Sequence, residues 1–277
     1  MTTEETAMSW NFMDPASREH IDRVWREESD GMFELASSPD VWEAPTGAGH
    51  WQARDVIGHL VDTTEAYFRS FDAARGRAEP WAALGVRDMA KYVDEGARAL
   101  RDVQQDELLE RLRQDRDRML GIAAELSDDD WAGLLVPHKY MGPLPAAFYP
   151  TFQVVDYAVH SWDIRQGTGR NHALDGDAAD LLVPLAFIVW QSTSEVVGAE
   201  PFTLGIRVTS GHNAGDTRVS VNDQGVAFEA GSIDDLADTI EFDPASLVLT
   251  AYGRTNAGTY RGDRQLLDRF SNLFFRI

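Results

Sequence analysis

The sequence predicts an α+β protein in which a long helical part precedes a small part built from strands and helices. Up to about residue 198, apolar residues recur every three or four positions, which is the spacing of amphipathic helices. From about residue 202, apolar and polar residues alternate, as they do in half-buried strands. We therefore expect a helical domain over residues 1–198 and an α+β domain over residues 199–277, divided near Gly198.

The expected helices follow one another along the first part. Helical spacing covers residues 21–35, 51–71, 87–103, 107–126, 146–166 and 178–197, and Ser127 has the position of a cap for a short helix. Residues 136–145 contain three prolines and a glycine, so we expect a loop there. The longest apolar run, residues 181–190, contains Pro184 and is too short to span a bilayer, so it predicts a buried helix.

The second part has signals of both kinds. Residues 202–209 are expected to form a strand. Residues 217–221 and 225–229 flank Asn222-Asp223-Gln224, which predicts a hairpin turn. Residues 246–253 and 265–275 are expected to be helical.

Composition excludes several classes of function. The 277 residues include no cysteine, which rules out disulfides, a cysteine nucleophile and a cysteine-ligated zinc site. A net charge of −21 disfavours nucleic acids and anionic membranes as partners, because both are bound through Lys and Arg. Residues 1–6 are acidic with no apolar run behind them, so we expect no signal peptide and a cytoplasmic protein. We expect small-molecule partners, and the sequence does not predict an oligomeric state.

Three residues predict a metal site. Asp156 and His160 are four residues apart, about one helical turn, so both side chains project from one face of a helix. His59 lies in another expected helix. Two imidazoles and one carboxylate from facing helices hold a divalent metal and leave one coordination position open, as catalytic sites do. We therefore expect His59, Asp156 and His160 to be ligands of one metal.

Each of these residues also has an ordinary structural explanation. Asp156 and His160 would be a solvated polar face, although the flanking residues are mostly apolar: Phe148, Phe152, Val155, Val159 and Trp162. His59 would be a histidine beside the apolar stripe of its helix. Asp163 is placed to accept the second N–H of His160, and Asp62 or Glu65 could do so for His59. His138-Lys139-Tyr140 would be either the mouth of a pocket or a polar loop tip.

The same segments resemble the signature segments of the mycothiol-dependent maleylpyruvate isomerase family, part of the wider DinB-like superfamily. The first segment contains Trp51, Arg54-Asp55 and His59-Leu60, and the second contains Asp156 and His160-Ser161-Trp162-Asp163. Near the end of the chain, Tyr252-Gly253-Arg254 and Gly262-Asp263 are similar to the C-terminal domain of the family, which is itself similar to sterol-carrier folds. The resemblance covers nearly the whole chain in order.

The resemblance implies a DinB-like up-and-down four-helix bundle that holds a divalent metal, usually zinc, followed by a sterol-carrier-like domain. It also implies mycothiol, the small thiol of actinobacteria, as cofactor or co-substrate. Carried over residue by residue, it makes His59, Asp156 and His160 the ligands and makes Arg254 a residue that acts on the substrate or thiol. Without the resemblance, Arg254 could equally be a surface arginine that caps a helix through its last carbonyls.

One departure bears on the reaction. The acidic ligand of the isomerases is typically Glu, and Asp156 is one methylene shorter, which leaves the metal and the substrate open. For this reason we favour thiol transfer to a small electrophile slightly over isomerisation. Two alternatives come from other classes: a metal-dependent hydrolase that uses water and needs no thiol, and a non-catalytic metal- or ligand-binding module.

Overall fold

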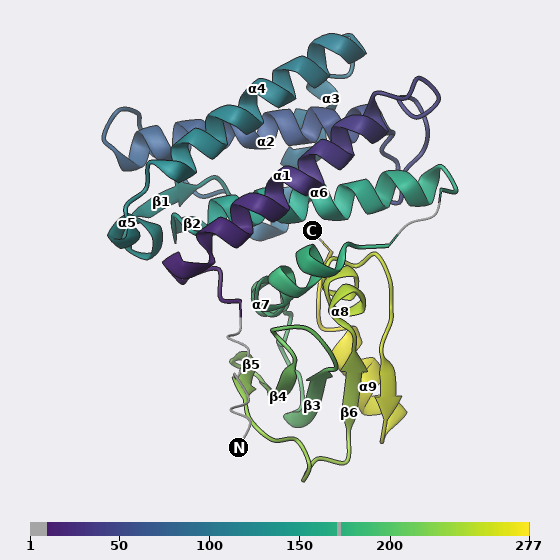
Figure 1. Ribbon diagram of the computed structural model, residues 1–277. Coiled ribbons are helices and arrows are strands. Elements are labelled where there is room, and N and C mark those ends of the chain that lie inside the picture. Colours follow the sequence, from purple (N-terminus) through teal and green to yellow (C-terminus); the bar gives the residue numbers. More distant parts are fainter. Residues whose placement is uncertain (1–9, 171–172, 277) are drawn as a thin grey trace, which may run out of the picture. The chain divides into compact units, whose positions relative to one another are not determined.

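The computed structural model describes residues 10–170 and 173–276 (Figure 1). The expectation for residues 1–6 therefore lies outside the described residues. Contacts divide the chain into two compact units. The helical unit comprises residues 12–178, and the C-terminal unit comprises residues 179–276 together with Trp10 and Asn11.

Four long helices form the bundle of the helical unit (Figure 1). They are α1 (Arg18–Ala36), α2 (Ala53–Ala74), α4 (Gln105–Ala124) and α6 (Phe148–Gly167). Helix α6 contacts α1, α2 and α4, and almost all of its residues between Tyr149 and Ile164 are buried. A helix with apolar residues on most of its sides is stable in such a central position. The shorter helical elements are η1 (Pro15–Ser17), η2 (Val86–Asp88), α3 (Met89–Ala99) and α5 (Asp128–Gly133).

The start of α2, the helix that carries His59, is fixed by an ion pair with a buried carboxylate. Asp55 closes a capping box with Gln52 and accepts two hydrogen bonds from Arg101, at 2.8 and 2.6 Å. Burial alone would raise the pKa of Asp55, but Arg101 and the backbone N–H of Gln52 outweigh it and lower that pKa. The charged carboxylate therefore stabilises the first turn, where the helix dipole also favours it.

The loop expected at residues 136–145 is a hairpin, so this prediction was wrong. Strand β1 (Leu135–His138) pairs antiparallel with β2 (Gly142–Pro145). Pro137 lies opposite Pro143 in the register. Each strand of a two-stranded ribbon has one unpaired edge, and prolines are tolerated at such edges because their missing N–H is not needed there.

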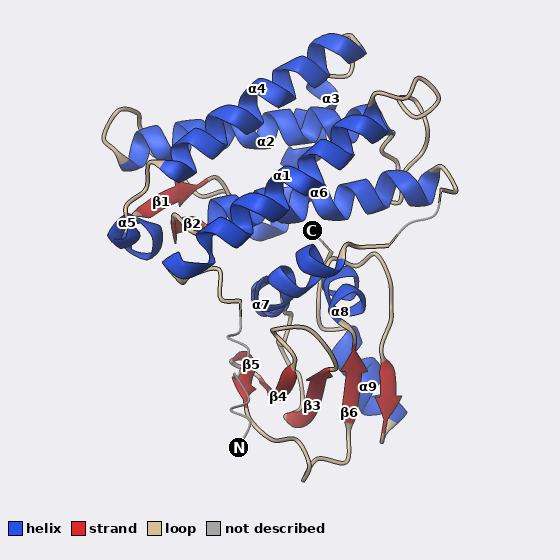
Figure 2. Ribbon diagram, in the orientation of Figure 1, coloured by secondary structure: helices blue, strands red, loops and turns tan. Residues whose placement is uncertain are grey.

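A five-stranded sheet forms the centre of the C-terminal unit, and its strand order is β5-β4-β3-β6-β7 (Figure 2). The expected strand and hairpin are confirmed as β3 (Phe202–Val208), β4 (Gly215–Asn222) and β5 (Gly225–Ala230). Two strands were not expected: β6 (Thr239–Phe242), which runs parallel to β3, and β7 (Thr259–Arg261). The helices of this unit are α7 (Gly176–Thr193), α8 (Pro244–Ala251) and α9 (Arg264–Ser271).

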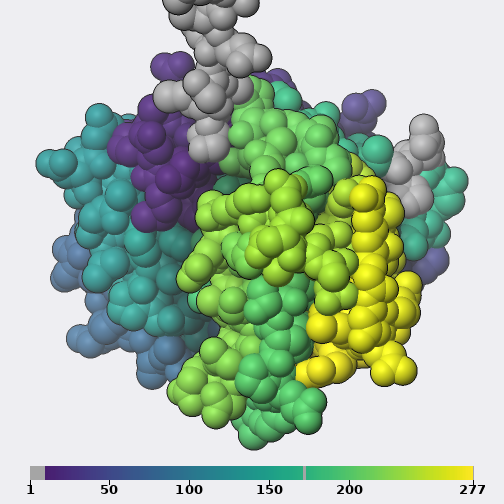
Figure 3. Space-filling model, turned by 90° about the horizontal axis from the view of Figure 1, so that it is seen from below, coloured from purple at the N-terminus to yellow at the C-terminus, as the bar shows by residue number. Residues whose placement is uncertain are grey.

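Helix α7 belongs with the sheet, so the units divide at residues 178 and 179 and not at the expected residues 198 and 199. The reason is packing. The indole of Trp190 on α7 lies 6.2 Å from the ring of Phe228 and 5.5 Å from the ring of Phe270. In the space-filling view, the yellow C-terminal segment lies against green segments of the same unit (Figure 3).

The expected α+β class, with a helical bundle first and a small α+β unit second, is confirmed. Among the residues that the structure describes, we find no helix with the length and apolar character needed to cross a membrane.

Candidate metal centre

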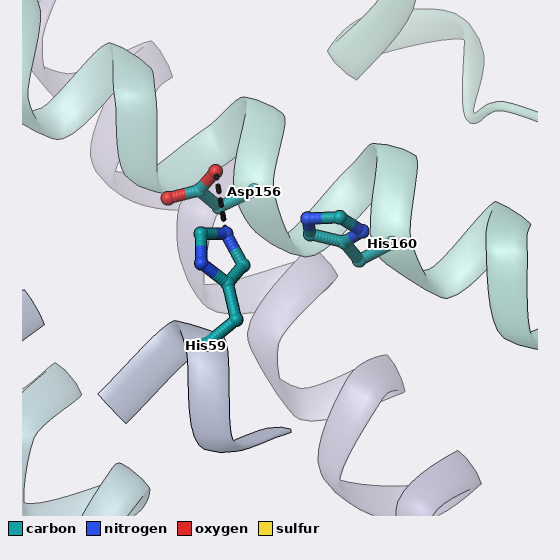
Figure 4. Close-up of side chains that lie close together, drawn as sticks. All are labelled: His59, Asp156 and His160. Atoms are coloured by element: carbon teal, nitrogen blue, oxygen red, sulfur yellow. Dashed lines mark ion pairs between the residues drawn. The ribbon is translucent and has the colours of Figure 1, made fainter. Parts of the chain in front are cut away.

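Helices α2 and α6 bring together the three residues that were expected to bind a metal (Figure 4). One ligand atom from each of His59, Asp156 and His160 lies within 4.8 Å of the other two. The Nε2 atom of His59 is 3.8 Å from Oδ1 of Asp156. Ligands about 2.0–2.1 Å from a tetrahedral zinc ion lie about 3.4 Å from one another, so small side-chain movements would complete such a site.

Asp163 holds His160 in one orientation and one tautomer. Its Oδ2 atom accepts from Nδ1 of His160 at 2.9 Å, and the carboxylate is fully buried. An ionised carboxylate only accepts, so the ring proton lies on Nδ1 and the lone pair on Nε2. This is the contact that the sequence predicted, and it is typical of metal-ligating histidines.

The partner of His59 differs from both expected carboxylates. Nδ1 of His59 lies 3.2 Å from the hydroxyl of Thr63, one turn further along α2. Glu65 instead forms a bidentate ion pair with Arg111, and Asp62 lies 4.0 Å from Nζ of Lys139. Thr63 is four residues after His59, so its hydroxyl lies on the same face of α2 and contacts Nδ1, while Nε2 of His59 faces Asp156.

Asp156 supplies the strongest indication that a cation belongs at this position. Its Oδ2 atom is buried and has no hydrogen-bond partner among the described residues. A buried oxygen of a carboxylate without a partner is costly, so buried carboxylates are normally paired or bound to a metal. The side chains of His59 and His160 lie close to the Asp156 carboxylate, and both are at least nine-tenths buried.

Trp51 covers both imidazoles. The centroid of its ring lies 5.2 Å from that of His59 and 5.9 Å from that of His160. Its indole N–H donates to Oδ1 of Asp94 at 2.9 Å, and His50 lies 2.8 Å from the same oxygen. Burial opposes ionisation of Asp94, but the hydrogen bonds from Trp51, His50 and Arg98 lower its pKa to about 2. The sequence motif included Trp51, but nothing in it indicated the role of Asp94.

A close backbone contact places the segment that carries Trp51. A Cβ atom at Gly167 would collide with the carbonyl of Pro45, so only glycine allows the 45–47 segment to approach the end of α6. The N–H of Gly47 donates to the carbonyl of Asp163 at 2.8 Å. The backbone at the C-terminal end of α6 thus fixes the position of the loop that leads into Trp51 and α2.

The His138-Lys139-Tyr140 cluster lies on the hairpin and is not an exposed loop tip. His138 is buried, and its Nδ1 accepts from the backbone N–H groups of Tyr140 and Met141. Burial lowers the pKa of His138 to about 4, although the negative charge of Asp156 works in the opposite direction. His138 is therefore neutral at pH 7 and lies near enough to Asp156 to feel its charge.

Arg254 lies in the C-terminal unit, just after α8. Its Nη1 atom donates to the carbonyl of Tyr252 at 2.8 Å, and its backbone N–H donates to the carbonyl of Leu249. These are the contacts of a residue that ends a helix. The expectation that Arg254 acts on the substrate remains a prediction.

Comparison with known proteins identifies the family. Residues 22–165, slightly more than half of the chain, match the family described as mycothiol maleylpyruvate isomerase N-terminal domain. The chain belongs to this family. The matched range contains all three residues of the candidate metal centre. A comparison with curated proteins gives no match.

Two solved structures of the mycothiol-dependent maleylpyruvate isomerase, one of them a mutant, resemble this isomerase-family chain in fold. The mutant has a TM-score of 0.58 at 15% identity, and the other has 0.56 at 16%. Each match covers 88% of this chain and 92% of the other chain. The colibactin self-resistance protein ClbS in complex with double-stranded DNA matches 57% of this chain and 99% of its own, at 14% identity and a TM-score of 0.48, which supports no inference about function.

Proposed function

We propose that this member of the isomerase family is a metal-dependent enzyme that uses mycothiol, and that it adds the thiol to a small electrophilic substrate. The observation that carries the proposal is the convergence of His59, Asp156 and His160, with an unpartnered oxygen on Asp156. Membership of the family supports mycothiol as the thiol. The absence of cysteine agrees with a thiol that arrives from outside the chain.

The donor set fits a divalent cation such as zinc. Both histidines present Nε2, since Nδ1 contacts Asp163 in one case and Thr63 in the other. A cation would also satisfy the buried oxygen of Asp156. Three protein ligands leave one position for a further ligand, as in catalytic sites. A divalent metal bound there would supply the positive charge that converts a thiol to its reactive thiolate at neutral pH.

The protein side chains prepare this reaction in three ways. Asp163 keeps the lone pair of His160 on Nε2. Trp51 covers the imidazoles and limits the access of water to them. We also propose that Arg254 binds a carboxylate of the electrophile through paired hydrogen bonds.

The covalent step is the same for the two reactions that we consider. The thiolate sulfur forms a bond to an electrophilic carbon of the substrate, and the electron pair of the attacked π bond moves onto the substrate. In a transferase the carbon–sulfur bond persists in the product after protonation. In an isomerase the carbon–carbon bond rotates, the carbon–sulfur bond breaks, and the thiol is released unchanged. The shorter ligand Asp156 favours transfer slightly.

Elemental analysis and turnover of the purified protein test the proposal. We expect about one divalent metal ion per chain and consumption of an electrophile only when mycothiol is present. Turnover without any thiol would instead support a metal-dependent hydrolase. Stoichiometric metal without turnover of any electrophile tested would support a binding module. Protein that retains no metal after dialysis and cannot be reloaded would reject the metal centre.

A further inference from the structure

The C-terminal unit contains a cavity of about 200 Å³, and none of its lining residues belongs to the candidate metal centre. Its apolar wall is mostly aromatic. The rings of Trp190 and Phe274 stack at an interplanar angle of 24°, with their centroids 5.5 Å apart. Phe270 meets both rings edge-on, at 5.5 and 5.0 Å. Aromatic rings prefer these geometries, so the wall offers a surface for one more flat ring.

The charge of the lining is unusual for this chain. Among the described residues that line the cavity, Arg276 carries the charge and no Asp or Glu is present. The whole chain has 46 acidic residues and 25 basic ones. Within the part of the chain that the structure describes, no hydrogen bond or ion pair engages the guanidinium of Arg276. A guanidinium with all its donors available is a ready site for a carboxylate.

Two other residues that line the cavity add to this arrangement. Gly253 has φ +66°, and a Cβ there would lie 3.4 Å from Cγ of Arg276. This is an ordinary contact distance, so the stem of the arginine lies beside Gly253, and the positive φ is what favours glycine there. Asn256 contributes a second donor, because its Oδ1 accepts from the hydroxyl of Tyr260 at 2.8 Å and its amide N–H groups remain for a ligand.

The volume sets the size of the occupant. Drug-sized ligands need pockets of about 300–1,000 Å³, whereas an apolar cavity of about 150 Å³ accepts a single benzene ring. A cavity of about 200 Å³ therefore has room for one ring and one small polar group. We infer that the cavity binds a small aromatic carboxylate, with the ring on the Trp190 and Phe274 wall and the carboxylate at Arg276. This inference does not depend on the proposed metal and thiol chemistry.

Calorimetric titration of the full-length protein with benzoate tests the inference. Benzoate is expected to bind one to one, and benzyl alcohol, which has a similar shape and no charge, about tenfold more weakly or worse. Arg276→Gln should weaken benzoate binding by about tenfold to a hundredfold, since it removes a charge-assisted contact. Because Arg276 is exposed, Arg276→Gln should leave the fold intact.

Two further variants locate the site. Arg261→Gln removes one positive charge from the same unit at a residue outside the cavity lining, and should change benzoate affinity less than twofold. Ser271→Leu should abolish binding by filling the cavity. The protein should stay folded, because the Ser271 hydroxyl hydrogen-bonds to the carbonyl of Leu267 in its own helix and otherwise makes only a long contact of 3.5 Å with the hydroxyl of Tyr260. No benzoate binding to the unaltered protein, equal losses in Arg276→Gln and Arg261→Gln, or full binding by a folded Ser271→Leu variant would each overturn the inference. Metal content, measured on the same samples, separates these outcomes from a failure of the proposed function.

Discussion

Asp163 in the helical unit and Asp180 in the C-terminal unit each hold Nδ1 of a histidine, and the two pairs differ in what surrounds the other ring nitrogen. The contact from His160 to Asp163 is 2.9 Å, and that from His212 to Asp180 is 3.1 Å. Both carboxylates are buried. By local geometry alone, the two pairs would have the same claim to be part of a functional site.

Their surroundings separate them. The ring of His160 is buried and lies 5.0 Å from the ring of His59, with Asp156 close by. The side chain of His212 is 42% exposed and stacks on Trp10. Asp180 also accepts the backbone N–H groups of His212 and Asn213, so this pair shapes the turn between β3 and β4. Within the described residues, a third ligating group joins only the first pair, and that convergence indicates a metal site where a lone pair does not.

Replacing the histidine of each pair should give the largest difference in metal content and turnover between the two units. His160→Ala is expected to lose stoichiometric metal and, with it, mycothiol-dependent turnover, because two ligands hold a divalent ion poorly. His212→Ala should keep both and lose about 1 kcal/mol of unfolding free energy through the broken hydrogen bond. Elemental analysis and chemical denaturation measure these effects. Full metal content in His160→Ala would remove the distinction.

Arg254→Ala tests whether the C-terminal unit, whose Asp180–His212 pair shapes a turn, contributes a residue to the reaction. We expect unchanged metal content and folding, and a loss of about tenfold to a hundredfold in kcat/KM, the cost of one charge-assisted contact to a carboxylate substrate. An equal loss in kcat would indicate that the contact forms mainly in the transition state. Arg261→Ala is the matched control, and identical kinetics for both variants would reject the role of Arg254.

The two carboxylates can be compared directly. Asp163→Asn should weaken metal affinity by about 10–100-fold, because it removes the group that orients His160. Asp180→Asn should leave metal affinity unaltered and lower the unfolding free energy by about 1–3 kcal/mol, because part-buried backbone donors lose their charged acceptor. Competition with a chelator gives the affinities. A loss of metal affinity in Asp180→Asn as large as in Asp163→Asn would contradict this assignment.

The smallest expected effect concerns Asp94, which holds the tryptophan over the imidazoles. Its pKa is about 2 in the folded chain and about 3.8 without these contacts. Because the folded pKa is the lower one, the stabilisation is complete above about pH 4 and is lost as the pH falls towards 2. Because 28% of the Asp94 side chain is exposed, we expect these contacts to contribute about 1–2 kcal/mol to the free energy of unfolding.

Asp94→Asn should therefore lose this pH-dependent stability between pH 4 and 2 in acid titrations followed by circular dichroism. Asp22→Asn, which alters an exposed carboxylate on α1, serves as the control. An acid transition in Asp94→Asn identical to that of the unaltered protein would show that the contacts to Trp51 and His50 do not stabilise the fold.

Several features could be read from the sequence because they depend on neighbours along the chain. The long helices follow from apolar spacing, and the hairpin at β4 and β5 follows from alternation around a polar turn. The one-turn spacing of Asp156 and His160 already places both on one face of α6, and Asp163 is near His160 for the same reason. Residues 136–145 were predicted to be a loop and form a hairpin, because prolines are typical of loops as well as of edge strands.

Tertiary structure decided everything that depends on residues far apart in sequence. Strand β6 is only four residues long and is defined by its parallel pairing with β3. Helix α7 joins the C-terminal unit because its aromatic residues pack there, although its periodicity matches the helices before it. Likewise the ion pair of Glu65 with Arg111 and the approach of Lys139 to Asp62 join residues that are far apart in sequence.

The convergence of His59 with Asp156 and His160 also depends on residues that are far apart in sequence. Spacing along each helix fixes which face a side chain occupies, but only the packing of α2 on α6 decides whether the two faces meet. In the core, Thr64 of α2 and Gln153 of α6 hydrogen-bond to each other, and this contact holds the two helices in register. The sequence thus determined the ligand types and their local spacing, whereas burial of the apolar surface of α6 brought them to one point.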